Sequence, residues 1–178
     1  MQFCSIIILA SLFCETTTVS KSSIGLTGGA LFQLFGDTSE AWPTLGSVME
    51  ISMPFVPSFG IRGTARLSWY TRKSGDLCLR NVAVIIATKY TKKIYKSPIG
   101  IYGGGGPGVH LYSWRKKEHI KGDNWIGFHF FTGIEYFFIK SKACCFGELD
   151  WGKEIGVGEK FPGFGELSQL GLTAGIRF

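Results

Sequence analysis

The chain has 178 residues, enough for one domain, and 45% of them are hydrophobic, 15% aromatic and only 18% charged. Mean hydropathy is +0.17, yet no apolar run after residue 20 is long enough for a transmembrane helix. The net charge is +6, but the basic residues collect in the connections between apolar segments, so they do not predict a nucleic-acid-binding stripe. This composition is typical of a β-barrel or β-sandwich, either soluble or inserted in a membrane.

Residues 1–20 predict a signal peptide, because an apolar core at 6–13 is followed by small polar residues. No Lys or Arg follows Met1, and a first strand or a disordered leader is the alternative. We therefore expect export and a mature domain of residues 21–178. Of the five cysteines, three would remain in that domain. Cys144 and Cys145 would point to opposite faces of a strand, and there is no CxxC pair, so neither a disulfide between them nor a zinc site is expected.

Period-two alternation of apolar and polar residues dominates the chain after residue 23 and predicts β-strands. In chain order, the predicted strands cover residues 24–35, 45–53, 59–71, 77–89, 98–114, 125–138, 144–151 and 167–178. Glycines 103–106 and Pro107 predict a bend or bulge in the fifth strand. Longer connections at 36–43, 71–76, 115–123 and 152–166 alternate with shorter ones, apart from 90–97, and this asymmetry is typical of a membrane barrel.

The two faces of these strands differ in chemistry. One face is crowded with bulky apolar side chains, among them Phe128, Phe130, Ile134, Leu170, Leu172 and Ile176. The other face is rich in Gly, Ser and Thr and carries scattered charges at Glu50, Arg62, Arg66, Glu135, Glu148, Asp150 and Arg177. An eight-stranded barrel has room inside only for its own side chains. We therefore expect the ionic residues to form a paired network in the lumen and the apolar residues to face lipid.

Aromatic residues near the predicted strand ends indicate girdles at the membrane interfaces. The candidates are Trp42, Trp69, Trp114, Trp125, Tyr136 and Trp151. The alternative is that these side chains are ordinary core residues.

Three stretches resemble small outer-membrane barrels of the OmpA/OmpX/OmpW-like family. They are the hairpin 133–151 (GIEYFFIKSKACCFGELDW), the glycine-rich strand 98–109, and the terminus 171–178 (GLTAGIRF). The resemblance implies an all-β, eight-stranded antiparallel up-and-down transmembrane β-barrel. It also implies that Phe178 is an assembly signal read by the barrel-assembly machinery. The expected location is the outer membrane, reached through the periplasm, with outer-membrane lipids such as lipopolysaccharide as partners.

A barrel enzyme that modifies lipid A would need a nucleophile, a base and an orienting acid within reach of one another. The candidate bases are His110, His119 and His129. His110 and Ser113 would lie on opposite faces of one strand, and His129 and Glu135 would be about 20 Å apart along another. We therefore expect no catalysis, no cofactor and no metal.

The expected protein is a monomer with a structural, surface-interaction or small-solute role and no nucleic-acid partner. Any recognition would belong to the long loops at 115–123 and 152–166. A soluble lipocalin-like ligand-binding barrel is the alternative from another class, because it would share the alternation with the two faces exchanged.

Overall fold

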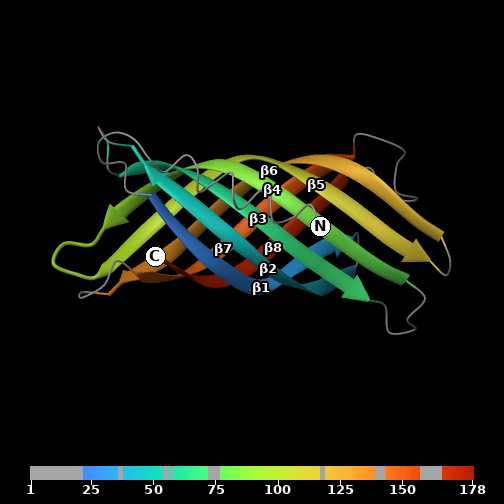
Figure 1. Cartoon of the computed structure of the whole chain (residues 1–178), viewed down its shortest axis with the longest axis horizontal. Helices are drawn as coiled ribbons and strands as arrows, with labels where there is room; N and C mark the ends of the chain where they lie inside the picture. Colours follow the sequence, from blue (N-terminus) through green and yellow to red (C-terminus); the bar gives the residue numbers. More distant parts are fainter. Residues whose placement is uncertain are drawn as a thin grey trace.

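The computed structural model describes residues 22–35, 38–53, 56, 58–71, 77–116, 119–138, 143–156 and 166–178. These residues form a closed barrel of eight antiparallel strands in up-and-down order (Figure 1). The strands are β1 (Ser22–Phe35), β2 (Thr38–Ser52), β3 (Phe59–Thr71), β4 (Leu77–Lys93), β5 (Ile99–Lys116), β6 (His119–Phe137), β7 (Cys144–Gly156) and β8 (Glu166–Arg177). Pairing of β1 with β8 closes the sheet. The predicted all-β, eight-stranded antiparallel barrel is confirmed.

Several strands are longer than their hydrophobic pattern indicates. The segment 115–123, expected to be a loop, consists mostly of the paired ends of β5 and β6, and β7 continues to Gly156. In β7 the alternation of buried and exposed positions continues through Ile155, and the backbones of β5 and β6 stay paired as far as Lys116 and His119. The predicted loops at 115–123 and 152–166 are therefore too long, and residues 117–118 and 157–165 lie outside the described residues.

The sequence predicted a bend or a bulge in the glycine-rich part of β5, and the register excludes the bulge. Its register against β4 is the same on both sides of Pro107, although the pairing is interrupted there, as expected for a residue without a backbone N–H. The glycines instead permit a close approach of β4. A Cβ atom on Gly104 would lie 2.0 Å from the carbonyl oxygen of Thr88, and one on Gly106 would lie 2.1 Å from that of Ile86.

Large apolar side chains are exposed at alternating positions on all eight strands. Of the residues predicted to face lipid, Phe128, Phe130, Ile134, Leu172 and Ile176 are exposed and Leu170 is half-buried. Exposed apolar surface on this scale is unusual for a monomeric protein in water. Among the described residues, no helix is long and apolar enough to cross a bilayer.

Two of the tryptophans expected at an interface instead fill the lumen. Trp42 and Trp125 are 1% and 0% exposed, and both pack against Tyr112, with ring centroids 6.4 and 5.9 Å away. They belong to a buried cluster with Leu31, Leu79 and Leu167. This cluster lies at the end of the barrel opposite the one where β1 begins and β8 ends. The girdle prediction is therefore wrong for both. Tyr136 and Trp151 point outward, Trp69 is half-buried, and the Trp114 side chain lies outside the described residues.

Candidate functional site

The lumen is filled by three layers of side chains. The aromatic and aliphatic cluster around Trp42 and Trp125 occupies one end. A layer of histidine, aspartate and glutamate lies in the middle, and a network of charged residues occupies the end where β1 begins and β8 ends. The candidate functional site is formed by the two polar layers.

The charged layer contains two carboxylates that share two cations. Lys89 donates to both oxygens of Glu50 at 3.0 Å and to Glu135 at 2.9 Å. Arg177 also forms ion pairs with both carboxylates and reaches Glu135 at 2.8 Å. Its guanidinium additionally donates to Cys144 Sγ at 3.3 Å. Each carboxylate is thus held between an ammonium and a guanidinium group.

Arg62 extends this network across the barrel. It forms a two-point ion pair with Glu148, one contact of which measures 3.2 Å, and its Nε lies 3.8 Å from Glu50. Tyr102 donates to Glu148 at 3.0 Å, and the Arg62 guanidinium lies 4.7 Å from the centre of the Phe131 ring. The layer balances three cations, Arg62, Lys89 and Arg177, with three carboxylates, Glu50, Glu135 and Glu148. This pairing offsets the desolvation cost of the buried charges.

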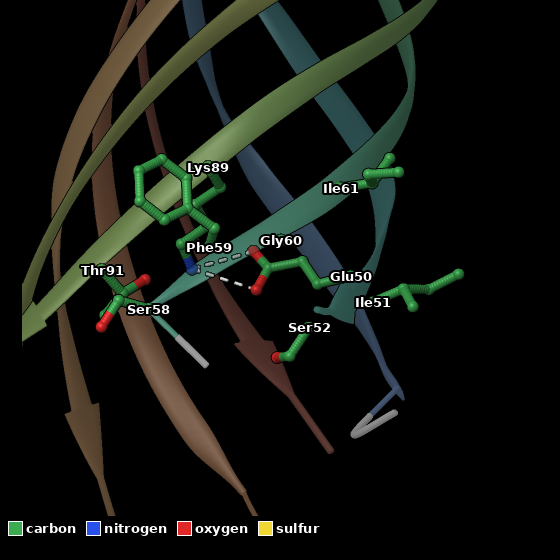
Figure 2. Close-up of a pocket in the computed structure, with 9 residues that line it drawn as sticks. All are labelled: Glu50, Ile51, Ser52, Ser58, Phe59, Gly60, Ile61, Lys89 and Thr91. Carbon is green, nitrogen blue, oxygen red and sulfur yellow. Dashed lines mark hydrogen bonds and ion pairs between the residues drawn. The ribbon is translucent and has the colours of Figure 1, made fainter. Parts of the chain in front are cut away.

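A small polar pocket opens beside this layer at the rim. Figure 2 shows Glu50 and Lys89 pointing toward each other above Ser52 and Thr91, which also line the pocket. The pocket lies over the ion pair, so solvent or a small polar group can reach the edge of the network from this end.

The middle layer is a chain of polar contacts. Arg66 forms an ion pair with Asp150 at 3.7 Å, and Asp150 lies 3.4 Å from His129 Nδ1. The Nε2 atoms of His129 and His110 are 2.9 Å apart, and both rings are completely buried. Glu154 follows on β7, where it accepts a hydrogen bond from the Tyr112 hydroxyl at 2.8 Å.

All seven ionic residues predicted for the lumen lie inside the barrel, but in two layers. Arg66 and Asp150 belong to the middle layer, and the other five belong to the charged layer. Sequence reasoning missed Lys89 and Glu154. The period-two alternation could have predicted both. Lys89 continues the inward positions 81, 83, 85 and 87 of β4, and Glu154 continues the inward positions 148, 150 and 152 of β7.

Phe178 lies on the outside of the barrel beside the closing strand pair. Its backbone N–H donates to Ile24 at 2.9 Å, and its carbonyl accepts from Ile24 at 3.1 Å, while the ring is 66% exposed. The ring is therefore open to an external partner, and its role as an assembly signal stays a prediction.

The two histidine pairings considered from the sequence, His110 with Ser113 and His129 with Glu135, are not formed in the described lumen. His110 points inward with no exposed surface, whereas Ser113 lies on the opposite face of β5. His129 and Glu135 occupy different layers. Within the described residues, the lumen histidines contact amide, imidazole and carboxylate groups.

A closed antiparallel barrel with an apolar exterior and a polar, filled lumen is the architecture that small outer-membrane β-barrels have. Comparisons with solved structures agree. Neisserial surface protein A (NspA) matches with a TM-score of 0.73 at 10% identity, over 90% of this chain and 98% of that one. Ail, the attachment invasion locus protein of Yersinia pestis, matches with a TM-score of 0.58 at 12% identity, over 90% and 100%.

The N-terminal β-barrel domain of OprF from Pseudomonas aeruginosa also matches, with a TM-score of 0.51 at 10% identity over 90% and 100% of the two chains. No protein-family model matches the chain, and no curated protein matches it by sequence. At these identities the likeness shows the fold alone. The chain has the eight-stranded fold of these outer-membrane barrels.

Proposed function

We propose that this chain is an integral outer-membrane barrel. The rim opposite the end where β1 begins and β8 ends would serve as an interaction surface. The observation that best supports this proposal is the distribution of side chains. Large apolar groups are exposed on every strand, whereas three balanced ion pairs are enclosed in the lumen. Lipid satisfies such an exterior, and a closed barrel leaves no unpaired strand edge in the hydrocarbon.

The enclosed charges also weigh against a soluble lipocalin-like barrel. A ligand-binding barrel of that class needs an apolar cavity and a polar exterior. Here the central lumen contains Arg62, Arg66 and Glu148, whereas Leu172 and Ile134 are 60% and 58% exposed. The arrangement is the inverse of the one that a soluble carrier requires.

The location is tested by expressing the full chain in a Gram-negative host and separating its membranes. We expect the protein in the outer-membrane fraction, with a band that changes mobility on boiling before gel electrophoresis. Recovery in the soluble fraction without detergent, together with mobility unaffected by boiling, would contradict the proposal.

Solute conduction is not favoured by the lumen. The side chains of Trp42, Trp125, His110, His129 and Gln169 are all at most 1% exposed and fill successive levels of the barrel. We therefore expect no stable channel steps when the refolded protein is added to a planar lipid bilayer. Reproducible unitary conductance would contradict the surface role and indicate that the barrel conducts small solutes.

In the sequence, the segment that joins β5 to β6 carries four basic residues, Arg115, Lys116, Lys117 and Lys121, and one acidic residue, Glu118. Among the similar structures, Ail has been solved in complex with the heparin analogue sucrose octasulfate. We infer that the rim beside this segment binds a sulfated or phosphorylated polyanion, because clustered cations raise the affinity for such ligands.

The test measures salt-dependent binding of heparin to the detergent-solubilised protein. Replacing Arg115, Lys116 and Lys117 together with Ala should reduce the affinity at least about 10-fold, whereas the same charge change at Lys92, Lys93 and Lys96 on the other rim should not. Equal losses from both triple variants would indicate attraction by net charge rather than a site.

A further inference from the structure

Two histidines and a glutamate converge in the middle of the lumen from three neighbouring strands. His110 lies on β5, His129 on β6 and Glu154 on β7, and none of the three has any exposed surface. One ligand atom from each residue lies within 4.8 Å of the others. The two imidazole Nε2 atoms are 2.9 Å apart, and Glu154 Oε1 is 3.3 Å from His110 Nδ1.

Glycines on the partner strands make the space that this cluster occupies. A Cβ atom on Gly127 would lie 2.8 Å from Glu154 Cγ and 3.5 Å from His110 Nε2. A Cβ atom on Gly152 would lie 2.7 Å from His129 Nδ1. Any larger residue at either position would push the three side chains apart.

Among the described residues, the only side chain of the ion-pair type that reaches Glu154 is the imidazole of His110. One carboxylate oxygen accepts from Tyr112, but Oε1 has no hydrogen-bond partner although it is buried. Within the described part of the chain, no Arg or Lys forms an ion pair with Glu154, whereas the neighbouring Asp150 pairs with Arg66. A buried carboxylate is strongly destabilising unless it takes up a proton or meets a cation.

We propose that His110, His129 and Glu154 bind a divalent transition-metal ion of the zinc type inside the barrel. Two imidazoles and one carboxylate are a ligand set that zinc uses. Two nitrogens on one tetrahedral zinc are about 3.3 Å apart, so the rings at 2.9 Å need to separate only slightly. The ion supplies the positive charge that Glu154 lacks.

Groups around the cluster hold both rings in the orientation that metal binding requires. Asp150 lies 3.4 Å from His129 Nδ1 and can accept its proton, which leaves Nε2 free for the ion. The Asn81 amide lies 3.2 Å from His110 Nδ1, and its Oδ1 has no hydrogen-bond partner. With the amide turned so that Oδ1 faces the ring, Asn81 accepts the Nδ1 proton and frees Nε2 in the same way.

The test refolds the full chain in detergent with zinc chloride, removes unbound metal by gel filtration, and measures zinc by elemental analysis. Cobalt(II) provides a second readout, because a tetrahedral site gives visible absorption bands. The variants are His110→Gln, His129→Gln and Glu154→Gln. His119→Gln is the matched control, since residue 119 is ten positions from His129 along β6, about 33 Å away.

We expect about one zinc per wild-type barrel, the same zinc content in His119→Gln, and at least a 10-fold loss of bound zinc in the three cluster variants. Glu154→Gln keeps its size and its acceptor for Tyr112, so it decides the result if the histidine variants do not fold, as judged by their mobility on boiling. No stoichiometric zinc in the wild type would overturn the proposal and leave a protonated Glu154 beside a hydrogen-bonded histidine pair. Zinc loss in His119→Gln alone would equally overturn it.

Discussion

Lys89 lies where two carboxylates approach each other across the lumen. Its ammonium contacts Glu50 and Glu135 at 3.0 and 2.9 Å, and the side chain is only 5% exposed. Arg177 is the other cation that both carboxylates share. Lys89 is therefore one of the two cations that both carboxylates share, and it enters the layer from β4.

Replacing Lys89 with Ala should lower the free energy of unfolding by about 3–5 kcal/mol, because a buried carboxylate pair would lose one of its two cations. Urea titration of the protein in lipid vesicles, followed by tryptophan fluorescence, measures the change. Lys92 is exposed on the same strand, so Lys92→Ala should change stability by no more than about 0.5 kcal/mol. Similar values for the two variants would show that the lumen network contributes little.

At this scale the sequence predicted the inward charges better than their partners. Period-two alternation assigns a residue to a face, so Arg62, Glu135 and Arg177 could be placed in the lumen. Alternation says nothing about register between strands, which decides which inward residues meet. His110 and His129 are 19 residues apart and share no metal-binding spacing, so their contact emerges only when β5 pairs with β6.

Among the strands, β5 depends most clearly on residues without side chains. Gly104 lies against the backbone of β4 at a point where a Cβ would be 2.0 Å from the Thr88 oxygen and 2.6 Å from the ring of Phe131. The backbone oxygen cannot move without disturbing the hydrogen bonds between the strands. At Gly147 in β7, by contrast, a Cβ would meet nothing within 4 Å.

Gly104→Ala should therefore destabilise the barrel by about 1–3 kcal/mol, the usual range for overpacking. Gly147→Ala is the matched control and should leave stability unchanged or slightly raised, because alanine reduces the freedom of the unfolded chain. The measurement is the urea midpoint in the same vesicles. Equal effects of the two substitutions would mean that the close contact with β4 relaxes without cost.

The sequence predicted which segments form strands, but not where most of the strands begin and end. The range 59–71 predicted for β3 matches Phe59–Thr71, because turn-forming residues flank it on both sides. β6 begins at His119 rather than residue 125, since its first six residues, HIKGDN, contain only one large apolar side chain and give no alternation. Likewise, the glycines of β5 predicted a bend or bulge, whereas the structure shows a close approach to β4 with one register on both sides of an interruption in the pairing.

Substitutions on the outward faces of β7 and β8 test whether lipid covers the barrel. Leu172 lies near the middle of its strand and is 60% exposed, whereas Ile155 is exposed near the end of β7. Leu172→Arg should cost about 2–4 kcal/mol in vesicles, and Ile155→Arg about 0–1 kcal/mol, because the cost falls with distance from the bilayer midplane. In detergent-free buffer a soluble barrel would tolerate both changes, so the absence of any depth dependence would contradict the membrane assignment.

Across the whole molecule, positive charge is unevenly distributed between the two rims. At the rim where β1 begins and β8 ends, the end of β4 and the connections 94–98 and 138–143 carry five lysines and no acidic residue; the lysines are Lys92, Lys93, Lys96, Lys140 and Lys142. At this rim, Lys93 lies 4.5 Å from the Phe137 ring and Lys96 lies 5.2 Å from the Tyr95 ring. Lysines next to aromatic rings suit a layer of anionic lipid headgroups, so this rim is well suited to rest at the surface of a leaflet rather than inside the hydrocarbon.

Barrel closure separates the backbone of Phe178 from its ring. The backbone joins β8 to β1 through the two hydrogen bonds with Ile24, whereas the ring is exposed, and its part in assembly stays a prediction. Phe178→Ala keeps the backbone bonds and removes only the ring. We expect this variant to refold in detergent with unchanged mobility on boiling, but to reach the outer membrane of a Gram-negative host at a lower level than the wild type.

Deleting Phe178 removes both the ring and the hydrogen bonds that its backbone makes with Ile24. It should therefore reduce assembly in cells at least as much as Phe178→Ala and also lower the urea midpoint of the refolded protein. The two measurements separate recognition from closure, because only the deletion changes the folded barrel itself. If Phe178→Ala assembles in cells as efficiently as the wild type, the ring is not a signal, and the terminal residue acts only as the last link of the closing strand pair.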